Sequence, residues 1–228
     1  MHQLTTAFTI MITIAAYFIG RQVFVRFHHP LANVVLVSTA LVISVLLAAG
    51  IPHADYVPGM EIMTYLLGPA TVALAVPVYK NRLLLKKYAG PIVAGVVSGS
   101  LLSITTAMLI VKLGGLNATV IASIAPKSAT IPFAVEVAGM TGGDPSLAAA
   151  FVVATGTFGS IFGLTLLTGL KISNPAIRGL AMGTVSHGQG VAMALTEGEQ
   201  QGSMAGVAMA LTGIFTAIAA PFLIPFFL

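Results

Sequence analysis

Long apolar runs are the feature of this sequence that most restricts its fold. A helix needs about 20 apolar residues to cross the hydrocarbon core of a bilayer. Every backbone polar group must find a partner there without water, so the crossing segments must be helices or a closed barrel. The runs that meet this length are residues 4–20, 31–51, 62–79, 91–111, 146–170 and 203–228. They predict an all-α integral membrane protein, a polytopic helical bundle with about six crossings.

The composition supports a lipid environment. Charged residues make up 7% of the 228 residues and hydrophobic ones 57%, whereas a soluble domain carries about 25% charged residues. The chain has no cysteine, which excludes a disulfide, a thiolate nucleophile and a zinc–thiolate site. Its net charge of +4 comes mostly from short loops, so it indicates topology and not a nucleic-acid partner. No cofactor and no metal site is predicted.

The positions of the basic residues predict the orientation of the first segments. Lys and Arg collect in the loops at 21–30 and 80–90, while the loop at 52–60 carries an aspartate and no Lys or Arg. Because basic loops stay in the cytoplasm, the first two loops are predicted to be cytoplasmic. The loop at 52–60 and the N-terminus are then predicted to lie outside.

The apolar stretch 119–137 does not read as a simple crossing. It contains two prolines and a lysine near its centre, which would break a continuous helix. If 112–118 lies outside and 171–178 inside, the run 146–170 accounts for the one crossing between them. The stretch then enters and leaves on the outer side, as a re-entrant hairpin with its tip at 126–130. Irregular backbone at this depth needs surrounding protein or a water-filled cavity.

A second stretch, 179–196, contains four glycines, a histidine and a glutamine. It predicts a second hairpin, entering from the cytoplasmic side. A model with eight crossings is the alternative. The segments 69–78 and 128–137 also resemble each other, as in an internal repeat, and paired broken segments mark the binding site of many transporters. A strict repeat would make 119–137 cross the membrane, which conflicts with the hairpin.

The broken segments carry the residues that are candidates for chemistry. Lys127 in the first is costly at membrane depth unless it is paired or hydrated, and with its hydroxyl neighbours it would suit a carboxylate; the alternative is a lysine that snorkels or pairs with Glu136. His187 in the second changes charge near neutral pH; the alternative is a histidine held between packed helices. Glu136 is a candidate for proton or cation coupling, or an interfacial acid in water. The predicted substrate-binding residues are Lys127, Ser128, Thr130, Ser186, His187, Gly188, Gln189 and Thr71.

An enzyme is the alternative from a different class. Ser186 and His187 are adjacent, so on a helix their side chains point apart. The sequence has no GxSxG elbow, no HExxH motif and no paired aspartates of the kind that hydrolases use. The chain is therefore predicted not to be an enzyme.

The sequence resembles the LrgB/CidB family of bacterial membrane proteins. The resemblance spans nearly the whole chain and is carried by the stretches PKSATIPFAVEVAGMTGG (126–143), PSLAAAFVVATGTFGSIFG (145–163), NPAIRGLAMGTVSHGQGVAMAL (174–195) and GPATVALAVPVYKN (68–81). It implies one of two functions. Some members are described as holin-like or antiholin-like modulators of murein hydrolase activity and autolysis, beside a partner of the LrgA/CidA type. Others resemble carriers of pyruvate, glycolate or glycerate. Gln189 departs from the small or apolar residue expected in the family, which leaves its role open.

Together these features predict a single LrgB-like transmembrane domain over residues 1–228, multi-pass in the bacterial inner (plasma) membrane. The broken helices with buried polar side chains favour a carrier of small monocarboxylates that works by alternating access at a midplane site. Proton or sodium coupling through His187 or Glu136, an LrgA/CidA-like partner and a homo-oligomer are further expectations. The alternative is the holin-like or antiholin-like modulator of autolysis.

Overall fold

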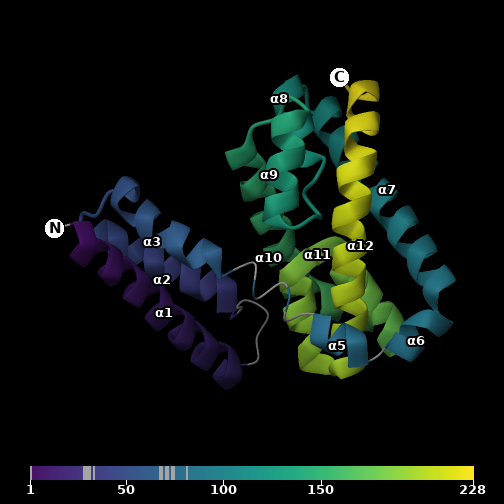
Figure 1. The fold of residues 1–228 in the computed structure, drawn as a ribbon, viewed down its shortest axis with the longest axis horizontal. Helices are drawn as coiled ribbons and strands as arrows, with labels where there is room; N and C mark the ends of the chain where they lie inside the picture. Colours follow the sequence, from purple (N-terminus) through teal and green to yellow (C-terminus); the bar gives the residue numbers. More distant parts are fainter. Residues whose placement is uncertain are drawn as a thin grey trace. The chain divides into compact units, whose positions relative to one another are not determined.

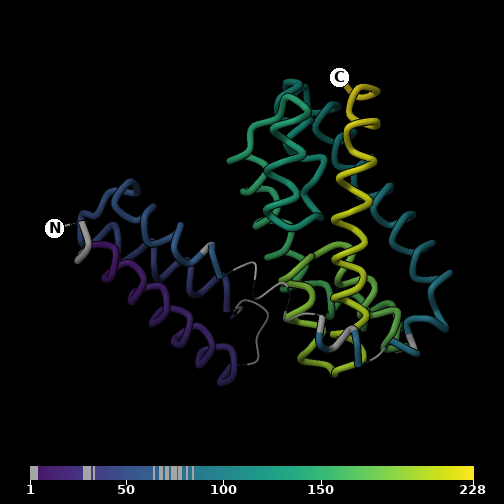
Figure 2. The backbone as a smooth tube through the Cα atoms, viewed as in Figure 1, coloured from purple at the N-terminus to yellow at the C-terminus, as the bar shows by residue number. Residues whose placement is uncertain are grey.

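A computed structural model of the chain describes residues 2–27, 32, 34–66, 69, 72, 75–80 and 82–228 (Figure 2). Every regular element in these residues is helical, which confirms the predicted all-α fold. They divide into two compact units, Met1–Ala75 and Val76–Leu228. The single domain predicted over 1–228 stays a prediction.

The first unit is a three-helix assembly in which α1 packs against the other two helices. Ser38 on α2 donates a hydrogen bond to the Ala16 carbonyl of α1 at 3.0 Å, and the hydroxyls of Thr13 and Tyr56 join α1 to α3 at 3.1 Å. Gly20 allows α2 to come close, since a Cβ there would lie 2.9 Å from a backbone oxygen of α2. The helices are α1 (His2–Phe27), α2 (Val34–Ala48) and α3 (His53–Tyr65).

The prediction of a loop at 52–60 is wrong, because α3 begins at His53. The hydropathy of this stretch is low, but Asp55 lies in the first turn, where a negative charge favours the helix dipole. Pro58 lies inside the helix; it removes one backbone donor and its ring crowds the carbonyl four residues earlier, but the helix continues to Tyr65. The described part of the predicted segment 62–79 is divided between α3 and α5 (Ala75–Lys80). Thr71 and much of the first copy of the possible repeat lie outside the described residues.

In the second unit, α12 extends from one end to the other, with α11 beside its beginning and α8 and α9 beside its end (Figure 1). The loops between these helices supply caps: Asn117, Asp144 and Asn174 each accept a backbone N–H of the helix that follows. The elements after α5 are α6 (Arg82–Lys87), α7 (Ala89–Leu113), α8 (Ala118–Ile124), α9 (Ile131–Met140), α10 (Pro145–Gly169), α11 (Pro175–Glu197), α12 (Glu199–Leu223) and a 3-10 turn (Ile224–Phe226).

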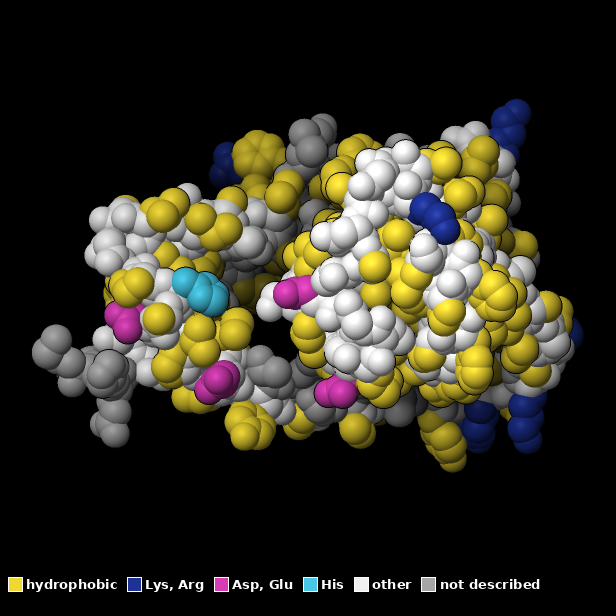
Figure 3. All heavy atoms as spheres, turned by 90° about the horizontal axis from the view of Figure 1, so that it is seen from above, with side chains coloured by type: hydrophobic (Ala, Val, Ile, Leu, Met, Phe, Trp, Pro, Cys, Tyr) yellow, Lys and Arg dark blue, Asp and Glu magenta, His cyan; other side chains and the backbone are white. Residues whose placement is uncertain are grey.

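Four helices in the described part of the chain are long and apolar enough to cross a membrane. They are Thr5–Phe27, Ala89–Leu113, Pro145–Gly169 and Glu199–Phe226, and each overlaps a predicted crossing. α2 is shorter, with 15 residues, or about 22 Å. Hydrophobic side chains cover much of the surface in Figure 3, with charged ones at a few places. The chain is a polytopic helical membrane protein, as predicted.

Candidate functional site: two opposed helical hairpins

The first hairpin consists of α8, the turn at 125–130 and α9. Its helices have seven and ten residues, too few for either to cross a bilayer. The backbone N–H of Asp144, just beyond α9, donates to the Ser123 hydroxyl of α8 at 2.8 Å. The chain therefore folds back beside α8 after α9. These residues form the predicted hairpin; its entry and exit on the outer side of the membrane stay a prediction.

The second hairpin is α11, which folds back on itself at His187. The backbone of His187 has φ 43° and ψ −133°, far from helical values. Arg178 and Glu197 would lie about 28 Å apart in a straight helix, yet the guanidinium of one bonds the carboxylate of the other. Where the two halves meet there is no room for a side chain at Gly190, since a Cβ would overlap the Met182 carbonyl. The prediction of a second broken segment is confirmed.

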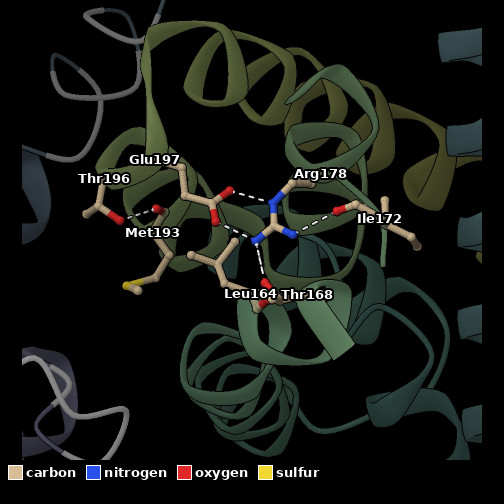
Figure 4. Close-up of polar contacts among 7 residues, drawn as sticks. All are labelled: Leu164, Thr168, Ile172, Arg178, Met193, Thr196 and Glu197. Atoms are coloured by element: carbon tan, nitrogen blue, oxygen red, sulfur yellow. Dashed lines mark hydrogen bonds and ion pairs between the residues drawn. The ribbon is translucent and has the colours of Figure 1, made fainter. Parts of the chain in front are cut away.

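Arg178 joins the two ends of this second hairpin, its base, through an ion pair with Glu197 (Figure 4). Its Nε donates to Glu197 Oε2 at 2.8 Å, and its Nη2 donates to the other carboxylate oxygen. Further bonds reach the Ile172 carbonyl at 2.8 Å and the Thr168 hydroxyl of α10 at 3.2 Å. The side chains of the pair are 10% and 24% exposed. Sequence reasoning treated Arg178 only as a topology signal, although it and Glu197 flank the predicted hairpin.

Along α10, the two hairpins occupy opposite ends. The N-terminal half of α10 packs against α9, where Val152 belongs to a buried cluster with Ala134. The C-terminal half packs against α11: a Cβ at Gly163 would meet Met182, and one at Gly159 would overlap Ser186. The hairpins therefore enter the second unit from opposite ends, and their tips approach each other near the middle of α10.

The contacts of α7 also place the first hairpin toward one end of the second unit and the second hairpin toward the other. A Cβ at Gly99 would lie 3.2 Å from Thr184 of the second hairpin, and Ser103 bonds Lys127 of the first. Four residues of a helix span about 6 Å, so the two tips lie about one turn apart along α7. Ser103 is the fifteenth residue of the 25 in α7, which places both tips near the middle of a membrane-crossing helix.

At the first tip, Lys127 lies against two serines. Its Nζ donates to Ser103 Oγ at 2.8 Å and to Ser128 Oγ at 3.3 Å, and the two hydroxyls lie 2.9 Å apart. Within the described residues, the hydrogen-bond partners of this ammonium are these hydroxyls and no carboxylate. Glu136 is exposed on α9 and does not form the pair considered from the sequence. Thr130 caps α9 without a side-chain hydrogen bond.

At the second tip, His187 is buried against α10. Its Nε2 lies 2.9 Å from the Val152 carbonyl, and because a carbonyl only accepts, Nε2 carries the hydrogen. A Cβ at Gly156 would overlap this imidazole. Gln189 Oε1 accepts a bond from the Ser160 hydroxyl at 3.4 Å. Ser186 is buried and Gly188 is exposed.

Sequence reasoning missed the partners of both tips on the long helices. These are Ser103 on α7 and Val152, Gly156 and Ser160 on α10. The repeated glycines of α10 were a usable signal, because small residues let helices come close. Ser103 carried no such signal.

The two tips together suit an anion. A lysine, two hydroxyls and the beginning of α9 lie at one tip, and the second half of α11 begins at the other. The first N–H groups of a helix lack partners within the helix, and helix N-termini inside a membrane favour negative charge. The water-filled cavity expected between the tips stays a prediction.

The fold defines a multi-pass α-helical membrane protein with two opposed helical hairpins. Residues 13–226 match the LrgB-like family, and the chain belongs to it. The uncharacterized protein YwbG of Bacillus subtilis is 36% identical over 96% of this chain and 97% of its own length. Antiholin-like protein LrgB of the same organism is 34% identical over 94% and 93%. Holin-like protein CidB of Staphylococcus aureus is 31% identical over 96% and 95%. No solved structure matches the chain.

These relatives confirm the resemblance and, with the four membrane-capable helices, the predicted location as a multi-pass protein of the bacterial plasma membrane. Their names agree with the alternative function, the holin-like or antiholin-like one. The names give no support to the transport of a carboxylate.

Proposed function

We propose that this protein is a holin-like or antiholin-like membrane protein that modulates murein hydrolase activity and autolysis, beside an LrgA/CidA-like partner. The observation that carries the proposal is the match to relatives with these names, at 31% and 34% identity over nearly the whole chain. Such a role needs no catalytic group of its own, in line with the prediction that the chain is not an enzyme.

The test is autolysis in a bacterium that lacks its own proteins of the LrgB and CidB types. The chain is expressed alone and with an LrgA-like protein, and murein hydrolase activity is measured in cell extracts together with the rate of lysis. A reproducible change in both quantities is expected in the presence of the partner. Unchanged hydrolase activity and lysis with either expression would refute the proposal.

A second candidate, favoured by one specific observation, is a carrier of small monocarboxylates such as pyruvate, glycolate or glycerate. That observation is the pair of opposed hairpins, whose tips hold Lys127 and His187 at mid-helix level. A pore needs no half-buried ammonium held by two hydroxyls, whereas such a group suits a carboxylate site. Lys127 has no carboxylate partner among the described residues, and its single positive charge matches an anion with one charge.

In this candidate the substrate carboxylate binds Lys127, Ser128 and Thr130, with the residues of the second tip opposite. Movement of the hairpins then gives alternating access. Coupling to a proton or sodium, with Glu136 or His187 as the proton group, belongs to the same proposal, as do a homo-oligomer and a single domain over both units. The other proposed substrate contacts are Ser186, Gly188, Gln189 and Thr71.

Vesicles distinguish the two candidates. The purified protein is reconstituted with and without an LrgA-like protein, and entry of radiolabelled pyruvate and glycolate is followed with release of a large trapped dye. A carrier gives saturable entry without dye release, and Lys127→Met abolishes that entry. Lys112→Met is the matched control, because Lys112 lies in the last turn of α7, away from the tips. Dye release without saturation would rule out a carrier and favour a holin-like pore.

A further inference from the structure

A cavity of about 360 Å³ lies away from the hairpin tips, where α7, α11 and α12 begin. Most of its wall is apolar, and the side chains of Ile92, Leu180 and Met204 belong to or pack on one buried cluster. Three polar side chains also face it, those of Tyr88, Asn174 and Gln200. The cavity therefore offers one apolar wall and one polar edge, as an amphipathic ligand requires.

Basic side chains lie beside the polar edge. The Nζ of Lys87 lies 5.5 Å from the centre of the Tyr88 ring, which lines the cavity. Lys80 lies 3.7 Å from the carboxylate of Glu199, the neighbour of the lining residue Gln200. That carboxylate offsets the charge of Lys80, whereas Lys87 forms no ion pair with the described residues, so its charge remains for a ligand.

The cavity also lies at the level of the membrane surface. It is at the N-terminal end of α7, a helix long enough to cross the membrane. The stretch before it, predicted as a loop at 80–90, is mostly the basic helix α6 (Arg82–Lys87), and the positive-inside rule places these basic residues in the cytoplasm. The neighbouring helix α6 has an exposed leucine, Leu83, among its basic residues. Basic clusters at this level attract anionic lipids, with about 1 kcal/mol for each Lys or Arg near the surface.

We propose that this cavity binds an anionic phospholipid of the cytoplasmic leaflet, with the phosphate at its polar edge. The phosphate lies beside Lys87 and the ring of Tyr88, and the glycerol and first methylenes lie against Ile92, Leu180 and Met204. The charge of the ligand complements the lysine, and its apolar part complements the wall. A soluble phosphate compound would also complement the charge of the lysine, but it has no apolar part to lie against the wall.

The absence of tryptophan from the chain allows a direct binding assay. Tyr88→Trp places one fluorescent ring in the cavity and keeps an aromatic face for Lys87. The variant is studied in nanodiscs of phosphatidylcholine and phosphatidylglycerol, with brominated acyl chains on one lipid or the other. Leu83→Trp on α6, 76% exposed and outside the cavity lining, is the control reporter. Ile177→Trp, which reports from the same cavity, replaces Tyr88→Trp if that variant does not fold.

The expected result is stronger quenching by brominated phosphatidylglycerol than by brominated phosphatidylcholine, with a larger preference in Tyr88→Trp than in Leu83→Trp. Adding Lys87→Gln lowers that preference about fivefold, while Lys112→Gln, at the other end of α7, leaves it unchanged. Equal preference at the two reporters would mean only general attraction to the surface and would overturn the proposal. Loss of the preference on adding free glycerol 3-phosphate would overturn it too, in favour of a soluble ligand.

Discussion

Removal of Arg178 tests whether the base of the second hairpin is fastened as described. The substitution Arg178→Met keeps a long apolar side chain but leaves the Glu197 carboxylate without its cation. It also removes the donors to the Ile172 carbonyl and the Thr168 hydroxyl. The two halves of α11 then lose the ion pair that joins them, and we expect the hairpin to open at its base.

The burial of the pair sets the size of the effect. Breaking a buried ion pair by removing one partner costs about 3–5 kcal/mol. The Glu197 side chain is 24% exposed, and water can partly replace the lost guanidinium, so we expect about 3 kcal/mol, the lower end of that range. Glu197→Gln keeps an oxygen that accepts a hydrogen bond and should cost less, about 1–2 kcal/mol.

The assay is reversible unfolding in mixed micelles, in which SDS is titrated into a mild detergent and helix content is followed by circular dichroism. The matched control is Lys80→Met, which breaks a pair whose side chains are 64% and 62% exposed; exposed pairs contribute about 0–1 kcal/mol. If Arg178→Met lowers the free energy of unfolding no more than Lys80→Met does, the pair does not fasten the hairpin and the reasoning fails.

Three further predictions concern the tips and caps. Gly156→Ala forces a methyl group against the His187 ring and should lower the free energy of unfolding by about 1–3 kcal/mol. Gly169→Ala, where the space is open, is the control and should not destabilise the protein. Equal melting temperatures of the two variants would contradict the packing. Ser103→Ala removes the 2.8 Å partner of Lys127 and should raise the KM for monocarboxylate entry if the chain is a carrier, while Ser98→Ala, which loses only bonds within its own helix, should leave it unchanged. Asn117→Ala removes the cap of α8 and should lower the unfolding free energy by about 1 kcal/mol; no change would mean that water caps the helix equally well.

The two hairpins could be predicted because the sequence breaks the helices itself. Pro126 and Pro132 lie in the middle of an apolar stretch. The predicted sides of the loops at 112–118 and 171–178 leave one crossing between them, and this favoured a hairpin over a second crossing. In the second hairpin the glycines around His187 marked the break. The turn itself is at His187, with a positive φ, and not at a glycine, which sequence rules favour for such a conformation.

The partners of the tips could not be predicted, because they depend on long-range packing. Ser98 and Ser103 are both polar residues on the same apolar helix, but the first bonds its own backbone while the second meets Lys127. Only the position of the first hairpin distinguishes them. In the same way, Arg178 and Glu197 become neighbours only when α11 folds back. The helix α3 was missed for a local reason, since a short polar stretch with a proline resembles a loop.

The opposed entry of the two hairpins is the central claim, and labelling of single cysteines from each side of the membrane tests it directly. The chain has no native cysteine, so the variants Leu116→Cys, Ser146→Cys, Ser173→Cys and Glu199→Cys each report one position. A membrane-impermeant maleimide should label the first two from outside in intact cells, and the last two only when the cytoplasmic side is opened. Labelling of Leu116→Cys and Ser146→Cys from opposite sides would mean that α8 and α9 cross the membrane, and the account of two opposed hairpins would be wrong.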